Sequence, residues 1–284
     1  MNARANGAVR INVLGQVEMS HGGEPVHLAE RQRVLLAALA LDYGQIVPVE
    51  RLIEVLWDAA PPASARTKLQ AHVCALRQAA GQSVRQEHGL LVTGASGYML
   101  CGDAAALDLA EFDFLTAQAR SAHESRRLAE ASQLFATALA LWRGAPFADV
   151  SSPAIAAAAV PLEERRVLAV EAKAEADLSQ GRYAAVAAEL PPWLFRLPLR
   201  ERLRGLLMIA LYRLGCRVEA LTLYRDGRQL MTSQVGLEPG ARLQALHRHI
   251  LADTEAIQPR EPPGVGSGLR TLPGLAGPAI VAIR

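Results

Sequence analysis

Patterns typical of β-strands are confined to the first hundred residues of this 284-residue chain. From residue 108 to about residue 252, the apolar residues recur only at helical spacing. Such a chain folds as an α+β part followed by an all-helical part, so the predicted fold class is mostly α. We divide it into an α+β domain over residues 1–102, an all-α domain over residues 103–255 and a disordered tail, rich in proline and glycine, over residues 256–284.

The predicted elements are short strands with three helices, followed by helices alone. The first domain has an antiparallel ribbon over residues 9–20 and 26–28, helices over residues 30–41, 49–57 and 63–80, a short strand at 46–47, and a closing hairpin of residues 90–93 and 98–101. The second has helices over residues 108–122, 127–142, 161–179, 182–190, 199–214, 218–233 and 239–251. Residues 211–230 have the small and aromatic residues of a tetratricopeptide-like helix pair. Pro191 and Pro192 are expected to shorten or kink their helix.

The composition excludes several classes of protein. Hydrophobic residues make up 51% of the chain and charged residues 20%, which is enough apolar material for a packed core. The longest apolar runs fall well short of the roughly 20 residues that a membrane span needs, and no leader is apparent. The three cysteines form no CxxC pair or even-numbered framework. We therefore expect a soluble protein of a reducing compartment, with no membrane partner.

The sequence also lacks the spacing patterns of enzymes and metal sites. GxSxG, HExxH and Cys–His arrangements are absent from it. His247 and His249 are two residues apart on a predicted helix, so they lie on nearly opposite faces and cannot share a metal ion. We expect no catalytic residue, no metal and no cofactor.

The most informative feature is a helix–turn–helix formed by residues 49–57, 58–62 and 63–80. One face of the last helix is apolar and predicted to be buried, with Leu69, Val73, Leu76 and Ala80. The opposite arc carries small and polar residues with cations beside it or at its margin: Thr67, Ala71, Cys74, Ala75, Gln78, Lys68, Arg66 and Arg77. Such a helix suits the DNA major groove, because small groups approach base edges and arginines reach phosphates or guanine. The following hairpin can act as a wing, with Arg85 near its entrance; an ordinary solvated helix is the alternative that the spacing leaves open.

The charges differ between the two halves of the chain. Residues 59–86 contain four cations and no acid. Residues 1–102 have a formal charge of +1, and residues 103–255 have −1. The helical domain is therefore expected to contact proteins rather than to add a large electrostatic footprint on DNA.

Two sets of segments resemble one known family. The first set resembles the winged helix of the Streptomyces antibiotic regulatory protein family: VRINVLGQVEM, ERQRVLLAALAL, VPVERLIEVLWDAAPPASARTKLQAHVCALRQAAG and TGASGYML. The second set resembles the bacterial transcriptional activation domain of the same family: ALALWRGAPFADV, PLRERLRGLLMIALYRLGCRVEALTLYRDGRQL and VGLEPGARLQALHRHIL. The segments follow the family's order over about residues 8–252.

The resemblance implies an OmpR-type winged helix without a receiver domain, joined to a helical tetratricopeptide-like domain. It implies a cytoplasmic, nucleoid-associated transcriptional activator of a secondary-metabolite (antibiotic) gene cluster. The implied partners are double-stranded promoter DNA, bound as direct repeats near the −35 element, and the RNA polymerase holoenzyme, with a homodimer on DNA left open. By position, the residues at the groove would be Arg66, Thr67, Lys68, Arg77 and Gln78, and Gly97 and Tyr98 would build the wing.

Two positions depart from the family pattern. Members usually carry a cation where Ala75 stands, and often another where Gln78 stands. Each lost phosphate contact weakens binding and lowers the salt dependence by about one unit of slope. The alternative function is therefore a helical-repeat interaction scaffold or co-regulator whose winged helix binds DNA weakly.

Overall fold

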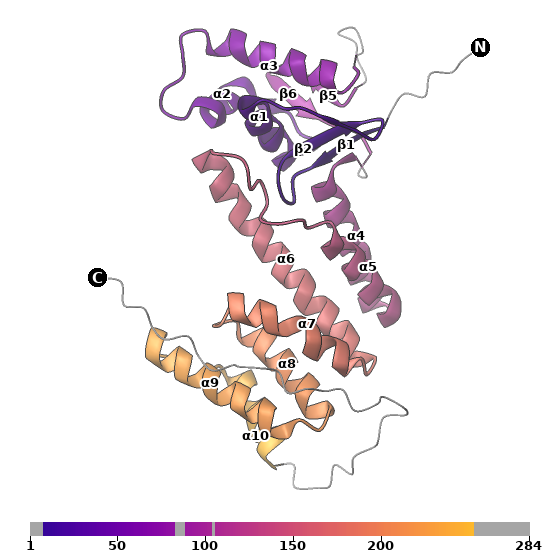
Figure 1. Cartoon of the computed structure of the whole chain (residues 1–284), viewed down its shortest axis with the longest axis vertical. Helices are drawn as coiled ribbons and strands as arrows, with labels where there is room; N and C mark the ends of the chain where they lie inside the picture. The colour runs from indigo at the N-terminus through magenta and orange to yellow at the C-terminus, as the bar shows by residue number, and fades with distance from the viewer. Residues whose placement is uncertain (1–7, 83–88, 104–105, 253–284) are drawn as a thin grey trace, which may run out of the picture.

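The computed structural model describes residues 8–82, 89–103 and 106–252, so the predicted tail lies outside the described residues. Two small antiparallel sheets and three helices form one end of the molecule (Figure 1). The sheets have the strand orders β1-β2-β3 and β4-β6-β5. The strands are β1 Val9–Asn12, β2 Glu18–His21, β3 Glu24–Val26, β4 Val47–Pro48, β5 Leu91–Thr93 and β6 Gly97–Leu100. The helices are α1 Glu30–Leu41, α2 Val49–Trp57 and α3 Ala65–Ala79.

The N-terminal ribbon differs from its prediction. Residues 9–20 do not form one strand, because the chain turns between β1 and β2 and pairs Ile11 with Met19. Most residues in this turn are nevertheless buried, Val13 and Leu14 among them. Their backbone N–H groups bind a side chain of the helical part instead of a neighbouring strand. The turn is therefore an attachment point, which alternating hydrophobicity alone could not reveal.

The remainder of the described chain is helical, and consecutive helices pack against one another. The helices are α4 Asp108–Glu124, α5 Leu128–Ala140, α6 Pro153–Ser179, α7 Tyr183–Arg196, α8 Glu201–Arg213, α9 Arg217–Val235 and α10 Ala241–Ala252. Figure 1 shows α6 running from the winged end of the molecule to α7 and α8. No helix in the described ranges is both long and apolar enough to cross a membrane.

Two predicted helix bounds differ from the structure by more than two residues, and both involve proline. α6 begins at Pro153 rather than at residue 161, and Pro161 lies inside it. α7 continues through Pro191 and Pro192 to Arg196, beyond its predicted end at residue 190. Each internal proline removes one N–H donor from the helix. All three are exposed, so the interrupted part of each helix faces water rather than the protein interior.

A continuous core joins the two sheets to the first helices of the helical part. One cluster of buried side chains runs from Ile11 in β1 and Leu35 in α1 through Leu69 in α3 to Phe112 in α4 and Phe135 in α5. The core therefore does not stop at residue 102, where the pattern of the sequence changes. The division of the chain into domains stays a prediction.

Asp108, the first residue of α4, fixes this junction. Its carboxylate accepts hydrogen bonds from the backbone N–H of Val13 at 2.8 Å and of Leu14 at 3.0 Å, and lies 3.2 Å from Nη2 of Arg143. Asp108 is only 1% exposed. Burial raises the pKa of Asp108, while the two N–H groups and Arg143 act in the opposite direction. The carboxylate thus satisfies two buried donors that have no partner in the β1–β2 ladder.

Replacing Asp108 with alanine is expected to destabilise the protein by about 2–4 kcal/mol, because two buried N–H groups then lose their acceptor. Urea unfolding followed by circular dichroism measures the loss as a lower midpoint. Asp113→Ala is the matched control on the same helix: this carboxylate is 49% exposed and pairs with Arg165, so its loss is expected to cost less than about 1 kcal/mol. Equal midpoints for the two variants would contradict the role given to Asp108.

Candidate nucleic-acid interface

The unit formed by α2, the turn and α3 places one face of α3 in the core. Ala65, Leu69, Val73 and Leu76 are buried there, and α3 packs against α1 and α2. The predicted buried face is confirmed at Leu69, Val73 and Leu76. Ala80, just beyond the helix, is only half-buried.

The opposite face of α3 is open to solvent. The exposed residues on it are Thr67, Lys68, Ala71, Cys74 and Gln78; Arg66 is exposed at the margin of the buried face, and Ala75 is half-buried. No acid lies in the first turn of α3. The positive end of the helix dipole and Lys68 therefore attract anions together. The small side chains further along the helix leave room for close approach by a base edge.

Arg66 forms an ion pair, whereas Lys68 forms none with the described residues. Nη2 of Arg66 donates to Oε1 of Glu50, the second residue of α2, in an exposed ion pair. No described residue forms an ion pair with Lys68. No spacing in the sequence points to Glu50, because the pair joins two helices and leaves no pattern within either.

Arg77 connects α3 to the hairpin that follows. Its Nε donates to the carbonyl of Leu91 at 3.0 Å, and its Nη2 donates to Oγ1 of Thr93 at 2.7 Å. Both acceptors lie on β5. The structure therefore shows Arg77 bound to the wing, at the edge of the exposed face of α3 rather than within it.

Gly97 and Tyr98 lie in β6, the second strand of the wing, and both are buried. β6 pairs with β4 on one side and with β5 on the other. A Cβ atom at Gly97 would overlap the carbonyl oxygen of Val47 in β4. The two residues therefore build the wing, whose exposed tip is formed by Ala95 and Ser96. Arg85, which was predicted near the entrance of the wing, lies outside the described residues.

His72 lies near the buried edge of α3, where its ring packs beside that of Trp57, with centroids 6.4 Å apart. Burial lowers the pKa of His72, and the charges of Arg31 and Lys68 lower it further. The imidazole is therefore neutral near pH 7 and adds no positive charge to the interface.

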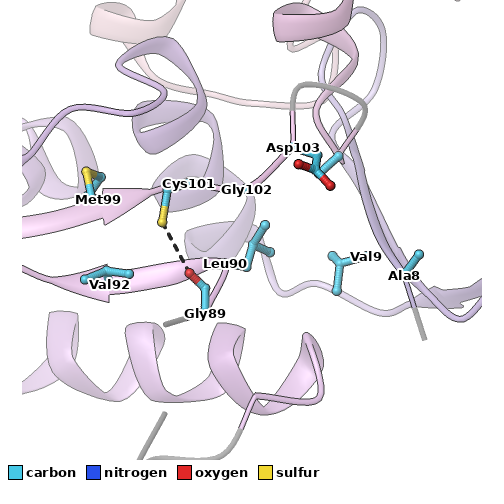
Figure 2. Close-up of a pocket in the computed structure, with 10 residues that line it drawn as sticks. Ala8, Val9, Gly89, Leu90, Val92, Met99, Cys101, Gly102 and Asp103 are labelled. Atoms are coloured by element: carbon cyan, nitrogen blue, oxygen red, sulfur yellow. Dashed lines mark hydrogen bonds between the residues drawn. The ribbon is translucent and has the colours of Figure 1, made fainter. Parts of the chain in front are cut away.

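A pocket of about 740 Å³ lies between the wing and the start of β1 (Figure 2). Its lining is mostly apolar, with Val92 and Met99 from the hairpin. The thiol of Cys101 donates to the carbonyl of Gly89 at 3.3 Å, and burial raises the pKa of this thiol. Cys101 and Asp103 are the only titratable residues in the described lining, so the pocket does not gather the groups that catalysis needs. No cluster of three or more metal-binding side chains occurs among the residues that the structure describes.

Comparison with known proteins accounts for both halves of the chain. The family model described as "Transcriptional regulatory protein, C terminal" matches residues 23–100, and the "Bacterial transcriptional activator domain" matches residues 107–251. Regulatory protein DnrI of Streptomyces peucetius is 34% identical over 279 residues, which cover 96% of this chain and 100% of DnrI. The chain belongs to the Streptomyces antibiotic regulatory protein family. The two matched models together describe a transcriptional regulatory protein with a transcriptional activator domain.

One further relative and one solved structure are similar to this chain over most of its length. Regulatory protein AfsR of Streptomyces coelicolor is 37% identical over 254 residues, or 89% of this chain, but the chain spans only about a quarter (25%) of AfsR. The solved structure of Mycobacterium tuberculosis EmbR in complex with a low-affinity phosphopeptide superposes with a TM-score of 0.82 at 32% identity, covering 86% of this chain and 65% of that one. This similarity confirms the predicted fold class, a winged helix followed by helices. The matched families and relatives are transcriptional regulators and not enzymes.

Gly97→Ala is expected to destabilise the wing by about 2–3 kcal/mol, because the added methyl group meets the backbone of β4 and cannot be accommodated by a side-chain rotation. The change is measured as a lower midpoint in urea. Gly144→Ala is the control, since a Cβ atom there meets only ordinary contacts. An unchanged midpoint for Gly97→Ala would show that β4 and β6 are not held as closely as the structure indicates.

Proposed function

We propose that this family member activates a secondary-metabolite (antibiotic) gene cluster by binding promoter DNA as direct repeats near the −35 element and engaging the RNA polymerase holoenzyme. In this proposal α3 enters the major groove and the β5–β6 wing lies against the adjacent DNA backbone. One observation carries it: the exposed face of α3, where Arg66 and Lys68 lie at a helix N-terminus whose first turn holds no acid.

The groove contacts are assigned to Thr67, Lys68 and Gln78 on the exposed face of α3 and to Arg66 at its margin. Arg77 supports the wing in the free protein through its bonds to β5. Its part in the interface is therefore to hold α3 and the wing in one orientation. With few free cations on α3, the protein depends on paired binding to adjacent repeats, which is why we include a homodimer on DNA.

The helical part is proposed to contact proteins. Large apolar side chains are exposed on five of its described helices, and the most exposed are Phe195 at 78%, Val218 at 71% and Val160 at 69%. Exposed apolar side chains are suited to protein contacts, whereas the formal charge of −1 over residues 103–255 does not favour a second DNA footprint. A protein that works on promoter DNA acts in the cytoplasm, at the nucleoid.

In vitro selection of random duplex DNA with the purified full chain tests the proposal, at low and then at physiological salt. Paired motifs about one helical turn apart are expected among the enriched sequences. If folded protein enriches no motif at either salt, the proposed function is wrong and the interaction scaffold replaces it.

The double variant Arg66→Ala, Lys68→Ala is expected to bind the selected duplex at least tenfold more weakly, because two contacts to DNA are lost together. The slope of log affinity against log salt is expected to fall by up to about two units. Fluorescence anisotropy over a salt series measures both quantities. Arg213→Ala, Arg225→Ala removes the same charge from exposed positions on α8 and α9 and is expected to leave specific binding unchanged. Equal losses in the two double variants would show that α3 is not the recognition helix.

A further inference from the structure

The ion pair between Glu50 and Arg66 is the only described contact that joins the first turn of α2 to the first turn of α3 through charged side chains. The two side chains are 69% and 70% exposed. An exposed pair of this kind contributes little to stability, because water screens both charges and both side chains lose freedom. The pair therefore contributes little to folding stability, and what it can do lies in where it holds the side chain of Arg66.

The backbone beneath Glu50 is held by the wing. The N–H of Val49 donates to the carbonyl of Ser96 at the wing tip, at 3.1 Å. Immediately before it, Pro48 of β4 pairs with Gly97 of β6, where the two backbones approach too closely for a Cβ atom. The carboxylate of Glu50 thus starts from a fixed backbone and reaches across to the recognition helix.

The chemistry of the pair distinguishes a base edge from a phosphate. A guanidinium has five N–H donors, and a carboxylate that accepts one of them from Nη2 leaves an edge with two parallel donors free. Such an edge matches the O6 and N7 acceptors of guanine. A carboxylate beside a phosphate would be repelled, whereas a base edge carries no net charge. Lys68, two residues further on and without an acidic partner, is the residue suited to a phosphate.

We propose that Glu50 is a positioning residue that holds Arg66 for bidentate recognition of one guanine, and so determines specificity at one base pair. This inference rests on the proposed function, because it requires α3 to enter the major groove. Two neighbouring cations then have different roles: Arg66 recognises a base, and Lys68 contributes affinity by contacting a phosphate.

The test compares Glu50→Gln with Glu54→Gln, which removes the same charge from an exposed residue one turn further along α2. Affinities are measured for the selected duplex, for duplexes with each base pair replaced in turn, and for a random duplex. Glu50→Gln is expected to reduce discrimination at one G·C pair by about tenfold and to leave the other positions unchanged. Glu54→Gln is expected to retain discrimination at every position, with at most a uniform gain in affinity from the lost negative charge.

Arg66→Lys provides the second arm, because lysine keeps the charge but lacks the planar fork. It is expected to lose discrimination at the same base pair as Glu50→Gln. In the Arg66→Lys background, Glu50→Gln is then expected to have no further effect there.

The outcomes separate this inference from the proposed function. If the unaltered chain selects a motif but Glu50→Gln discriminates at every position as before, the positioning role of Glu50 is wrong. The proposed function as a DNA-binding regulator is then retained. If Glu50→Gln only strengthens binding uniformly, Glu50 merely repels DNA, and the inference is also wrong. If the unaltered chain selects no motif, both proposals are wrong. All variants alter exposed side chains, and equal thermal midpoints establish that they fold.

Discussion

The buried carboxylate of Asp108 joins the sheets at one end of the molecule to the helices that follow them. Asp108 begins the helical part, yet its oxygens bind the backbone of the turn between β1 and β2. Removing a carboxylate from water is costly unless donors surround it, and here two N–H groups and Arg143 do so. The backbone on either side strengthens the attachment, since Arg143 N–H donates to Leu14 and Phe147 N–H donates to Val13. The two sheets and the first helices of the helical part are consequently packed around one core, which also includes the buried face of α3.

α6 extends this continuity to the far end of the molecule. Its first half packs against α1 and α2, and its second half carries two buried acids that fix the next helices. Glu171 accepts from Arg200 at the start of α8, and Asp177 binds Ser132 of α5 together with Lys173. Ser132, Arg182 and Arg200 belong to neighbouring helices or to the residues just before them, so these contacts hold α6 against α5, α7 and α8, while Lys173 binds Asp177 within α6.

The sequence predicts well what local periodicity controls and poorly what depends on contacts between elements. The bounds of α1 and α2 and the buried face of α3 follow from apolar spacing and agree with the structure. The helix predicted over residues 161–179 begins too late, at Pro161, because an exposed proline in an alanine-rich helix interrupts only bonds that water can replace. The exposed face of α3 was likewise predictable, whereas the partners of Arg66 and Arg77 were not, since they come from another helix and from a strand.

The small number of free cations on α3 has a consequence for how a regulator of this kind discriminates between sites. Phosphate contacts strengthen specific and non-specific binding alike, so a chain with fewer of them gives up affinity on all DNA. Base contacts strengthen binding only at the correct sequence. In the proposed complex, with Ala75 half-buried, Gln78 uncharged and Arg77 bound to the wing, the base contacts of α3 supply a larger share of the binding free energy. The ratio of specific to non-specific affinity then rises even as affinity falls, and a second subunit on an adjacent repeat restores the affinity without reducing that ratio.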